Sequence, residues 1–129
     1  MNLILLAAGK STRIYNKIKI NKCLININGK SLIKNIIDNA KLSSIKKIWI
    51  VTGFKPKNII KELKNYKKIN YIHNSRYKTT DMVNSAMLAL KKSKDDVVIS
   101  YTDIFYEKKA FDDLKKINPK FITLPYITN

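Results

Sequence analysis

The chain has 129 residues, 45% of them apolar, which suits one small domain that buries a core and excludes two domains of ordinary size. Its formal charge of +17 favours a polyanionic partner, yet only Arg13 and Arg76 among the 26 basic residues are Arg. Contacts to base edges and bidentate contacts to phosphate depend on Arg, and the Lys residues are spread along the chain. We therefore expect a solvated basic surface in preference to one that binds nucleic acid.

Cys23 is the single cysteine, so an intrachain disulfide is excluded and a reducing compartment, the cytoplasm, is expected. The first apolar run is only about six residues long, and no basic residue precedes it. Such a run is too short for a membrane span and lacks the basic flank of a signal peptide. We expect a first strand there and no membrane partner.

The predicted elements alternate between strands and helices from the first residues on. A strand over Asn2 to Leu6 comes before a helix over Ser31 to Ala40, which begins with a good N-cap and repeats its apolar side chains at helical spacing. A second strand covers Lys47 to Thr52. A proline at a first-turn position then predicts a helix over Lys57 to Asn65.

The same alternation continues through the rest of the chain. The predicted elements there are a strand over Asn70 to His73, a helix over Thr80 to Lys91, a strand over Val97 to Tyr101, a helix over Glu107 to Lys116 and a strand over Phe121 to Leu124. Strands that alternate with helices imply crossover connections. We therefore predict an α/β fold with a Rossmann-like, mostly parallel, doubly wound sheet.

Ligands of such sheets bind beyond the carboxyl ends of the strands. The segments that leave those ends are Ala7 to Lys22, Gly53 to Lys55, Asn74 to Thr80 and Thr102 to Tyr106. Because parallel strands all end at the same edge, we expect these four segments to converge on one crevice.

The stretch LILLAAGKSTR, from Leu3 to Arg13, contains a GKST that is typical of the end of a phosphate-binding P-loop. A P-loop also needs a Gly five positions before the Gly of its GK pair, and Ile4 occupies that position here. The following RIYNKIKINK lacks the helical periodicity that a P-loop requires directly after its Lys. The P-loop interpretation is therefore rejected.

A different pattern fits a longer span. LLAAGKSTR, followed by Lys22 in NKCLININGKSLI, resembles the signature of the nucleotidyltransferase superfamily, which includes MobA-like and sugar-phosphate nucleotidyltransferase domains. In that signature a strand ending in LAAGxGTR is followed by PKxL and then by a Gly before the first helix. Ser11 stands where the family usually has its second Gly, and Asn21 where it usually has Pro.

The resemblance extends along nearly the whole chain. NSRYKTTDMVNSAMLAL resembles a segment of the phosphocholine and sugar-phosphate cytidylyltransferases in which Asn, an aromatic residue and TNMVxSL lead into a helix. Asp81 replaces the usual Asn in this segment. VVISYTDIFY resembles the strand that ends in the metal-binding Asp of the superfamily, with Thr102 where Gly is common.

The resemblance implies transfer of a nucleoside monophosphate, with CMP from CTP favoured, to a small phosphorylated acceptor such as phosphocholine or a sugar phosphate. Attack on the α-phosphorus brings anions together, so positive charge must offset the charge on the moving oxygens. By resemblance, Arg13 holds the leaving pyrophosphate and Lys22 stabilises the α-phosphate. Asp103 would hold Mg²⁺, a hard cation that prefers oxygen ligands.

The same resemblance assigns nucleotide binding to two groups of residues: Leu6, Ala7, Ala8 and Gly9 at the end of the first strand, and Thr80, Asp81 and Ser85 at the start of a helix. An ionised Asp81 only accepts hydrogen bonds, so it favours the cytosine amino group over a uracil carbonyl. We expect Gly9, Thr80 and Ser85 to line one crevice with the three charged residues.

Structural alternatives remain for these residues: Lys22 as a solvated side chain, Arg13 in an ion pair, and Asp103 as a helix cap. Members of the superfamily usually run well past 129 residues. We therefore expect residues 1–129 to be the N-terminal part of a longer domain, incomplete at its C-terminus. Two other functions stay open, a catalytically incomplete nucleotide-binding module and a basic nucleic-acid-binding domain, which would need its Lys residues on one face.

Overall fold

The computed structural model describes residues 1–9, 20–114 and 116. Its elements, in chain order, are β1 (Asn2–Ala7), the 3-10 helix η1 (Lys22–Leu24), β2 (Asn26–Ile27), β3 (Lys30–Ser31), α2 (Leu32–Lys41), β4 (Ile48–Thr52), α3 (Pro56–Glu62), β5 (Ile69–His73), α4 (Met82–Leu90), β6 (Val97–Tyr101) and α5 (Lys108–Leu114). The first four predicted strands and all four predicted helices are present. The predicted strand over Phe121 to Leu124 lies outside the described residues.

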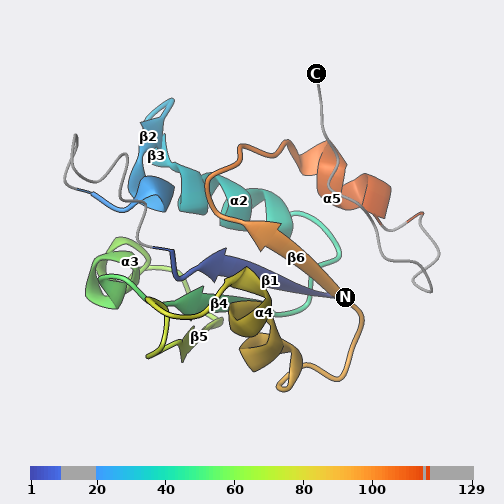
Figure 1. The fold of residues 1–129 in the computed structure, drawn as a ribbon. Helices are drawn as coiled ribbons and strands as arrows, with labels where there is room; N and C mark the ends of the chain where they lie inside the picture. Colours follow the sequence, from blue (N-terminus) through green and yellow to red (C-terminus); the bar gives the residue numbers. More distant parts are fainter. Residues whose placement is uncertain (10–19, 115, 117–129) are drawn as a thin grey trace.

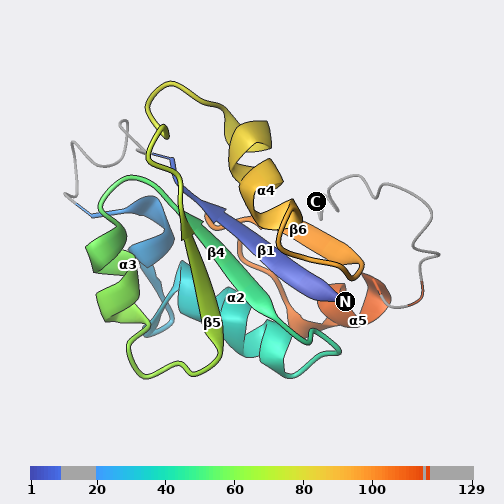
Figure 2. The same ribbon diagram turned by 90° about the horizontal axis from the view of Figure 1, so that it is seen from below.

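Four strands form one parallel sheet in the order β5, β4, β1, β6. Leu5 of β1 pairs with Ile50 of β4 on one side and with Ser100 of β6 on the other. Helices α2 and α5 cover one face of the sheet and α4 covers the other (Figures 1 and 2). The prediction of a parallel, doubly wound α/β sheet is confirmed. No helix within the described ranges is long and apolar enough to cross a membrane.

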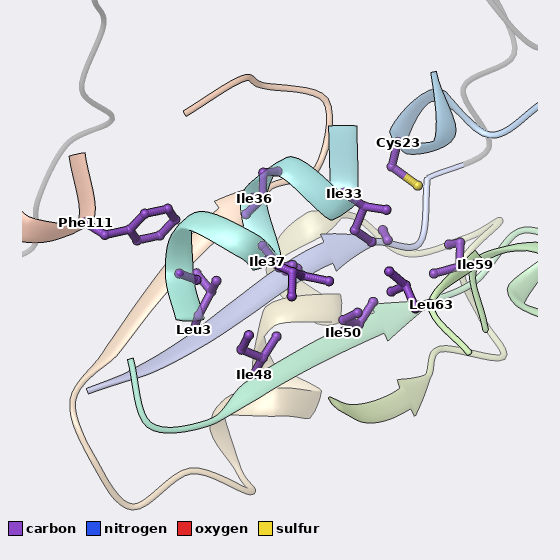
Figure 3. Close-up of a cluster of buried hydrophobic side chains, with 13 residues drawn as sticks. Leu3, Cys23, Ile33, Ile36, Ile37, Ile48, Ile50, Ile59, Leu63 and Phe111 are labelled. Carbon is purple, nitrogen blue, oxygen red and sulfur yellow. The ribbon is translucent and has the colours of Figure 1, made fainter. Parts of the chain in front are cut away.

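Strand β1 is buried along its whole length because helices cover both of its faces. Successive side chains of a strand point to opposite faces. Leu3 and Leu5 therefore join the cluster under α2 (Figure 3), whereas Ile4 and Leu6 join a second cluster under α4. Burial on both faces explains why the strand is an uninterrupted apolar run, with no polar residue between its apolar ones.

Helix α2 begins where its N-cap signal predicts. The Ser31 hydroxyl accepts a hydrogen bond from the backbone N–H of Lys34 at 3.4 Å. Ile33, Ile36 and Ile37 are fully buried against the sheet and make up much of the cluster in Figure 3. The helix thus fixes the end of the loop that carries η1.

Helices α3 and α4 are shorter than their sequence patterns predict. Helix α4 begins at Met82 instead of Thr80, because Asp81 has extended backbone angles and caps the helix with its side chain. Helix α3 ends at Glu62 instead of Asn65, because the chain turns back toward β5 over the next residues. Both differences are shifts at helix ends and leave the order of elements unchanged.

A two-stranded hairpin, β2 with β3, was not predicted from the sequence. Its two-residue turn is Asn28–Gly29, and both residues have positive φ, 54° and 84°. These angles are those of a type I′ turn, for which Asn-Gly is the favoured sequence. The hairpin connects η1 to the N-cap of α2 and so limits where η1 can lie.

Gly53 lies where the end of β4 approaches the end of β1 and the loop after β5. A Cβ at this position would stand 2.5 Å from the Ala8 carbonyl oxygen and 2.6 Å from the Cβ of Tyr77. The same carbonyl accepts the backbone N–H of Phe54 at 3.3 Å. Only a residue without a side chain permits this approach, which holds together the segments that leave β1, β4 and β5.

Candidate functional site

A cleft opens where the strand order of the sheet reverses. From β1 the chain passes to β4 and then outward to β5, and it returns to the other side of β1 as β6. The connections after β1 and β6 therefore leave in opposite directions, which creates a crevice at the carboxyl ends of these strands. The residues that line it are Leu6, Ala7, Gly9, Asn21, Lys22, Cys23, Met82, Tyr101, Thr102 and Asp103.

Thr102 fixes the β6 side of the cleft. Its buried hydroxyl donates a hydrogen bond to the backbone carbonyl of Leu6 at 3.1 Å, so the end of β6 is tied to the end of β1. The next residue, Asp103, is exposed at the cleft. A Thr at the position where the superfamily commonly has Gly thus has a structural role here, which is to anchor the backbone that carries Asp103.

Lys22 faces Asp103 across the cleft. Its Nζ donates to Oδ2 of Asp103 at 2.7 Å, although the two residues are 81 positions apart in the sequence. The two side chains are 38% and 36% exposed, so both remain within reach of a ligand. The structure therefore brings together the predicted phosphate-binding cation and the predicted metal-binding carboxylate.

Two neighbours hold the backbone of Lys22 in place. Cys23 is buried in the cluster under α2, and the amide of Asn21 donates from Nδ2 to the Phe54 carbonyl at 3.1 Å. Burial raises the pKa of the Cys23 thiol to about 12, so this thiol is protonated at neutral pH and is no nucleophile, although it lines the cleft.

The backbone at Asn21 shows why Asn can stand where the family usually has Pro. Its backbone angles are φ −63° and ψ 139°, and this φ is the value that Pro imposes. Its side-chain Oδ1 is buried without a hydrogen-bond partner among the described residues. The backbone here therefore has the shape that the usual Pro would give, and Asn adds a contact to Phe54 at the cost of an unsatisfied acceptor.

We predict that Asn21→Pro folds with a free energy of unfolding within about 1 kcal/mol of the wild type. The substitution loses one hydrogen bond, but it removes a buried unsatisfied oxygen and restricts the unfolded chain. Urea denaturation measures the difference. The matched control is Asn28→Pro, where φ is 54° and Pro cannot adopt the native angle, so a clear loss is expected. Equal losses for both variants would contradict the prediction.

Asn74 organises the loop between β5 and α4. Its buried side chain donates from Nδ2 to the hydroxyls of Thr80 at 2.9 Å and Ser85 at 3.0 Å, and its Oδ1 accepts the backbone N–H of Arg76. Its own N–H donates to the Thr52 carbonyl at 2.7 Å. Thr80 and Ser85 are therefore not among the residues that line the cleft. Their hydroxyls accept hydrogen bonds from Asn74 within the loop. The assignment of these two residues to nucleotide binding stays a prediction.

Asp81 is the N-cap of α4. Its Oδ1 accepts hydrogen bonds from the backbone N–H of Asn84 at 3.0 Å and from the Asn84 side chain at 2.8 Å. These hydrogen bonds lower the pKa of the Asp81 carboxyl below its usual range, so the group is ionised at neutral pH. The carboxylate is exposed at the end of the helix whose first residue, Met82, lines the cleft.

The other predicted site residues lie as follows. Leu6, Ala7 and Gly9 line the cleft, whereas Ala8 is buried next to it with its carbonyl bonded to Phe54. Arg13 lies outside the described residues. Sequence reasoning did not single out Cys23, Met82 or Tyr101, which complete the cleft wall. No local signal distinguishes them, because apolar side chains at strand and helix ends usually belong to the core.

The donor set suits one mode of metal binding. Within the described ranges, no group of three or more His, Cys, Asp or Glu side chains is placed to hold a metal ion. Mg²⁺ at nucleotide sites is usually held by one or two carboxylates together with phosphate oxygens of the substrate. The single carboxylate of Asp103 fits a cation shared with a nucleotide, and it does not fit a site built from protein ligands alone.

Many exposed lysines lie at the opposite edge of the sheet. The segments that lead from the last turn of each helix into β4, β5 and β6 carry Lys41, Lys46, Lys47, Lys64, Lys67, Lys68, Lys91, Lys92 and Lys94. The amino ends of parallel strands share one edge, so segments far apart in the sequence gather there. These lysines therefore gather at the amino ends of the strands, and this lysine-rich edge lies away from the cleft.

A doubly wound parallel sheet with a cleft at its switch point defines an α/β domain of the class that binds its ligand at the carboxyl ends of the strands. The chain matches the family model described as the MobA-like NTP transferase domain over residues 3–116, and it belongs to that family. The resemblance that the sequence motifs indicated is confirmed.

Individual proteins agree with this assignment. The CTP:phosphoglutamine cytidylyltransferase of Campylobacter jejuni is 33% identical over 127 residues, which cover 93% of this chain and 49% of that relative. The chain thus spans about half the length of this curated relative.

Two solved structures share the fold. One is a nucleotidyl transferase of Methanothermobacter, Mth528, with a TM-score of 0.76 and 14% identity, covering 89% of this chain and 56% of that one. The other is the CTP:phosphocholine cytidylyltransferase LicC of Streptococcus pneumoniae, with a TM-score of 0.69 and 24% identity, covering 84% and 49%.

Proposed function

We propose that the chain carries the nucleotide-binding part of a nucleotidyltransferase that transfers CMP from CTP to a small phosphorylated acceptor and releases pyrophosphate. The observation that carries the proposal is the Lys22–Asp103 pair at the switch point of the sheet. A cation and a carboxylate at this place suit a phosphate and the metal ion that accompanies it. The acceptor is phosphocholine or a related small phosphate, with a sugar 1-phosphate as the near alternative.

In the proposed reaction an oxygen of the acceptor phosphate attacks the α-phosphorus of CTP. A new P–O bond forms while the bond from the α-phosphorus to the pyrophosphate oxygen breaks, and the electron pair leaves with pyrophosphate. Negative charge grows on the oxygens around the α-phosphorus, and the Lys22 ammonium would stabilise it. Arg13 would hold the departing pyrophosphate. Positioning of the two anions supplies much of the remaining rate enhancement.

A divalent cation, Mg²⁺ in this proposal, would be held by Asp103 and by phosphate oxygens of the nucleotide, and it would withdraw charge from them. The backbone of Leu6, Ala7 and Gly9 would form the floor against which the nucleotide lies. Gly9 leaves space at this point, because no atom of the described residues lies within 4 Å of where its Cβ would be.

The names of two related proteins support CTP as the nucleotide, since the Campylobacter relative and LicC are both described as CTP-dependent cytidylyltransferases. Their acceptors differ, being phosphoglutamine in one name and phosphocholine in the other. A pyrophosphate-release assay with each nucleoside triphosphate and a panel of phosphocholine, phosphoglutamine and sugar 1-phosphates tests the proposal. It is run on this chain and on a version extended at its C-terminus.

Two outcomes favour the other functions. Nucleotide binding without pyrophosphate release in both versions indicates a binding module. The lysine-rich edge supports the nucleic-acid alternative, and salt-sensitive binding of duplex DNA without binding of nucleotide would favour it.

We predict that Asp81→Asn reduces the preference for CTP over UTP by about tenfold and leaves stability almost unchanged. Asn is as good an N-cap as Asp, so α4 keeps its start. An ionised Asp only accepts hydrogen bonds, whereas Asn can also donate to a uracil carbonyl. Calorimetric titration with both nucleotides and thermal denaturation measure the two effects.

The matched control is Asp95→Asn, which removes the same charge from an exposed loop at the far edge of the sheet. Its CTP preference is expected to equal that of the wild type. Tighter or equal binding of UTP by the wild type would overturn the base assignment.

A further inference from the structure

The Lys22–Asp103 ion pair occupies two groups that the proposed reaction needs for other partners. The Lys22 ammonium must meet phosphate, and the Asp103 carboxylate must meet the cation. In the structure each of the two groups is engaged by the other at 2.7 Å. Resting on the proposed function, we infer that Lys22 is a latch that excludes a divalent cation from Asp103 until a nucleotide arrives.

Both ends of the pair come from backbone that is fixed. Asp103 follows Thr102, whose hydroxyl is bonded to the Leu6 carbonyl, and Lys22 lies between Asn21, bonded to Phe54, and the buried Cys23. The two side chains therefore meet because of where their backbones are held. Only the side chains have to move when partners are exchanged.

The pair is weak enough to open. Both side chains are more than a third exposed. An ion pair of this kind contributes about 0.2 to 1 kcal/mol, which a bound ligand readily exceeds. A buried pair would instead resist opening, because each charge, once separated, would have neither water nor an opposite charge to stabilise it.

A nucleotide with its cation replaces both partners at once. The triphosphate offers Lys22 a new anion, and the cation offers Asp103 a new positive charge. A cation alone would have to displace Lys22 and leave an ammonium beside a dication. A nucleotide alone would place its phosphates beside a carboxylate. Cation and nucleotide are therefore expected to bind cooperatively, each strengthening the other by the same factor.

The test uses Mn²⁺ as the probe, with free Mn²⁺ measured by electron paramagnetic resonance first without nucleotide and then in the presence of CTP. Lys22→Met removes the ammonium and keeps the length of the side chain. We expect it to bind Mn²⁺ about threefold to tenfold more tightly than the wild type, because a competing charge next to Asp103 is lost. In Lys22→Met, the factor by which CTP strengthens Mn²⁺ binding should be smaller than in the wild type.

Lys30→Met is the matched control. Lys30 forms an exposed ion pair with Asp38, also at 2.7 Å. It begins β3, after the hairpin turn, whereas η1 comes before β2. Its loss leaves the same net charge as Lys22→Met, and we expect unchanged Mn²⁺ affinity. Each protein is also compared with its Asp103→Asn counterpart, so that Mn²⁺ held elsewhere on the surface is subtracted.

The outcomes separate the latch from the proposed function. If Asp103→Asn weakens Mn²⁺ binding but Lys22→Met does not tighten it, the latch is wrong and the metal role of Asp103 stands. If Asp103→Asn leaves Mn²⁺ binding unchanged in every background, both without CTP and with CTP present, the metal role itself fails and the latch fails with it. Equal tightening by Lys22→Met and Lys30→Met would indicate a general charge effect and would also overturn the latch.

Discussion

Lys22→Ala is expected to lower kcat by a factor on the order of 10² to 10³, the scale seen when one preorganised stabilising group is removed from an active site. The charge that Lys22 would stabilise grows only as the bond to pyrophosphate breaks, so binding of the nucleotide should weaken much less than turnover. Steady-state kinetics with the cognate acceptor, together with calorimetric titration of the nucleotide, measure both quantities.

Two further variants sharpen this experiment. Lys22→Arg should restore only part of the activity, because a planar guanidinium cannot occupy the position of a point charge without shifting the phosphate. Lys30→Ala, which breaks an ion pair of equal length away from the cleft, should keep wild-type turnover. If Lys22→Ala turns over normally and only binds nucleotide poorly, Lys22 is a ground-state anchor and the catalytic role is withdrawn.

Asp103→Asn is expected to reduce metal-dependent turnover by a similar factor, on the order of 10² to 10³. Asn keeps the shape of the side chain but loses the charge that would hold the cation. Raising the concentration of Mg²⁺ should recover part of the activity, because the phosphates of the nucleotide would still supply ligands. The measurement is turnover as a function of Mg²⁺ concentration in the wild type and the variant.

Stability distinguishes this interpretation from a structural one. The Lys22–Asp103 pair is partly exposed, so Asp103→Asn should change the free energy of unfolding by less than about 1 kcal/mol. A large loss of stability, with activity lost in proportion to the unfolded fraction, would instead show that Asp103 mainly holds the fold. Asp112→Asn is the control for the loss of charge, because Asp112 forms a partly exposed ion pair with Lys108 on α5.

The elements of the fold could be predicted from the sequence because their signals are local. The apolar run of β1, the N-cap and isoleucine spacing of α2, and the alternation of strands with helices each depend on residues a few positions apart. The hairpin turn at Asn28–Gly29 also had such a signal, and it was missed because its strands are only two residues long.

The candidate site could be predicted only in part. The spacing of the motifs pointed to Gly9, Lys22 and Asp103, and all three line the cleft. The same motifs placed Thr80 and Ser85 in it as well, but both hydroxyls are bonded to Asn74 instead. A motif identifies which segment approaches a ligand, whereas the partner of each side chain depends on which neighbour the packed loop brings nearest.

The sequence by itself thus determined which segments are strands and helices, and which short stretches carry phosphate-directed residue types, since periodicity and motif spacing are properties of the chain alone. The tertiary structure decided that β6 returns to the far side of β1, and this return opens the cleft. It also decided that Lys22 and Asp103 meet across 81 residues of sequence. The physical reason is that such a contact depends on the packing of two separately anchored backbones. The motifs and the order of strands place both segments at one edge of the sheet, but they do not fix which side chains touch.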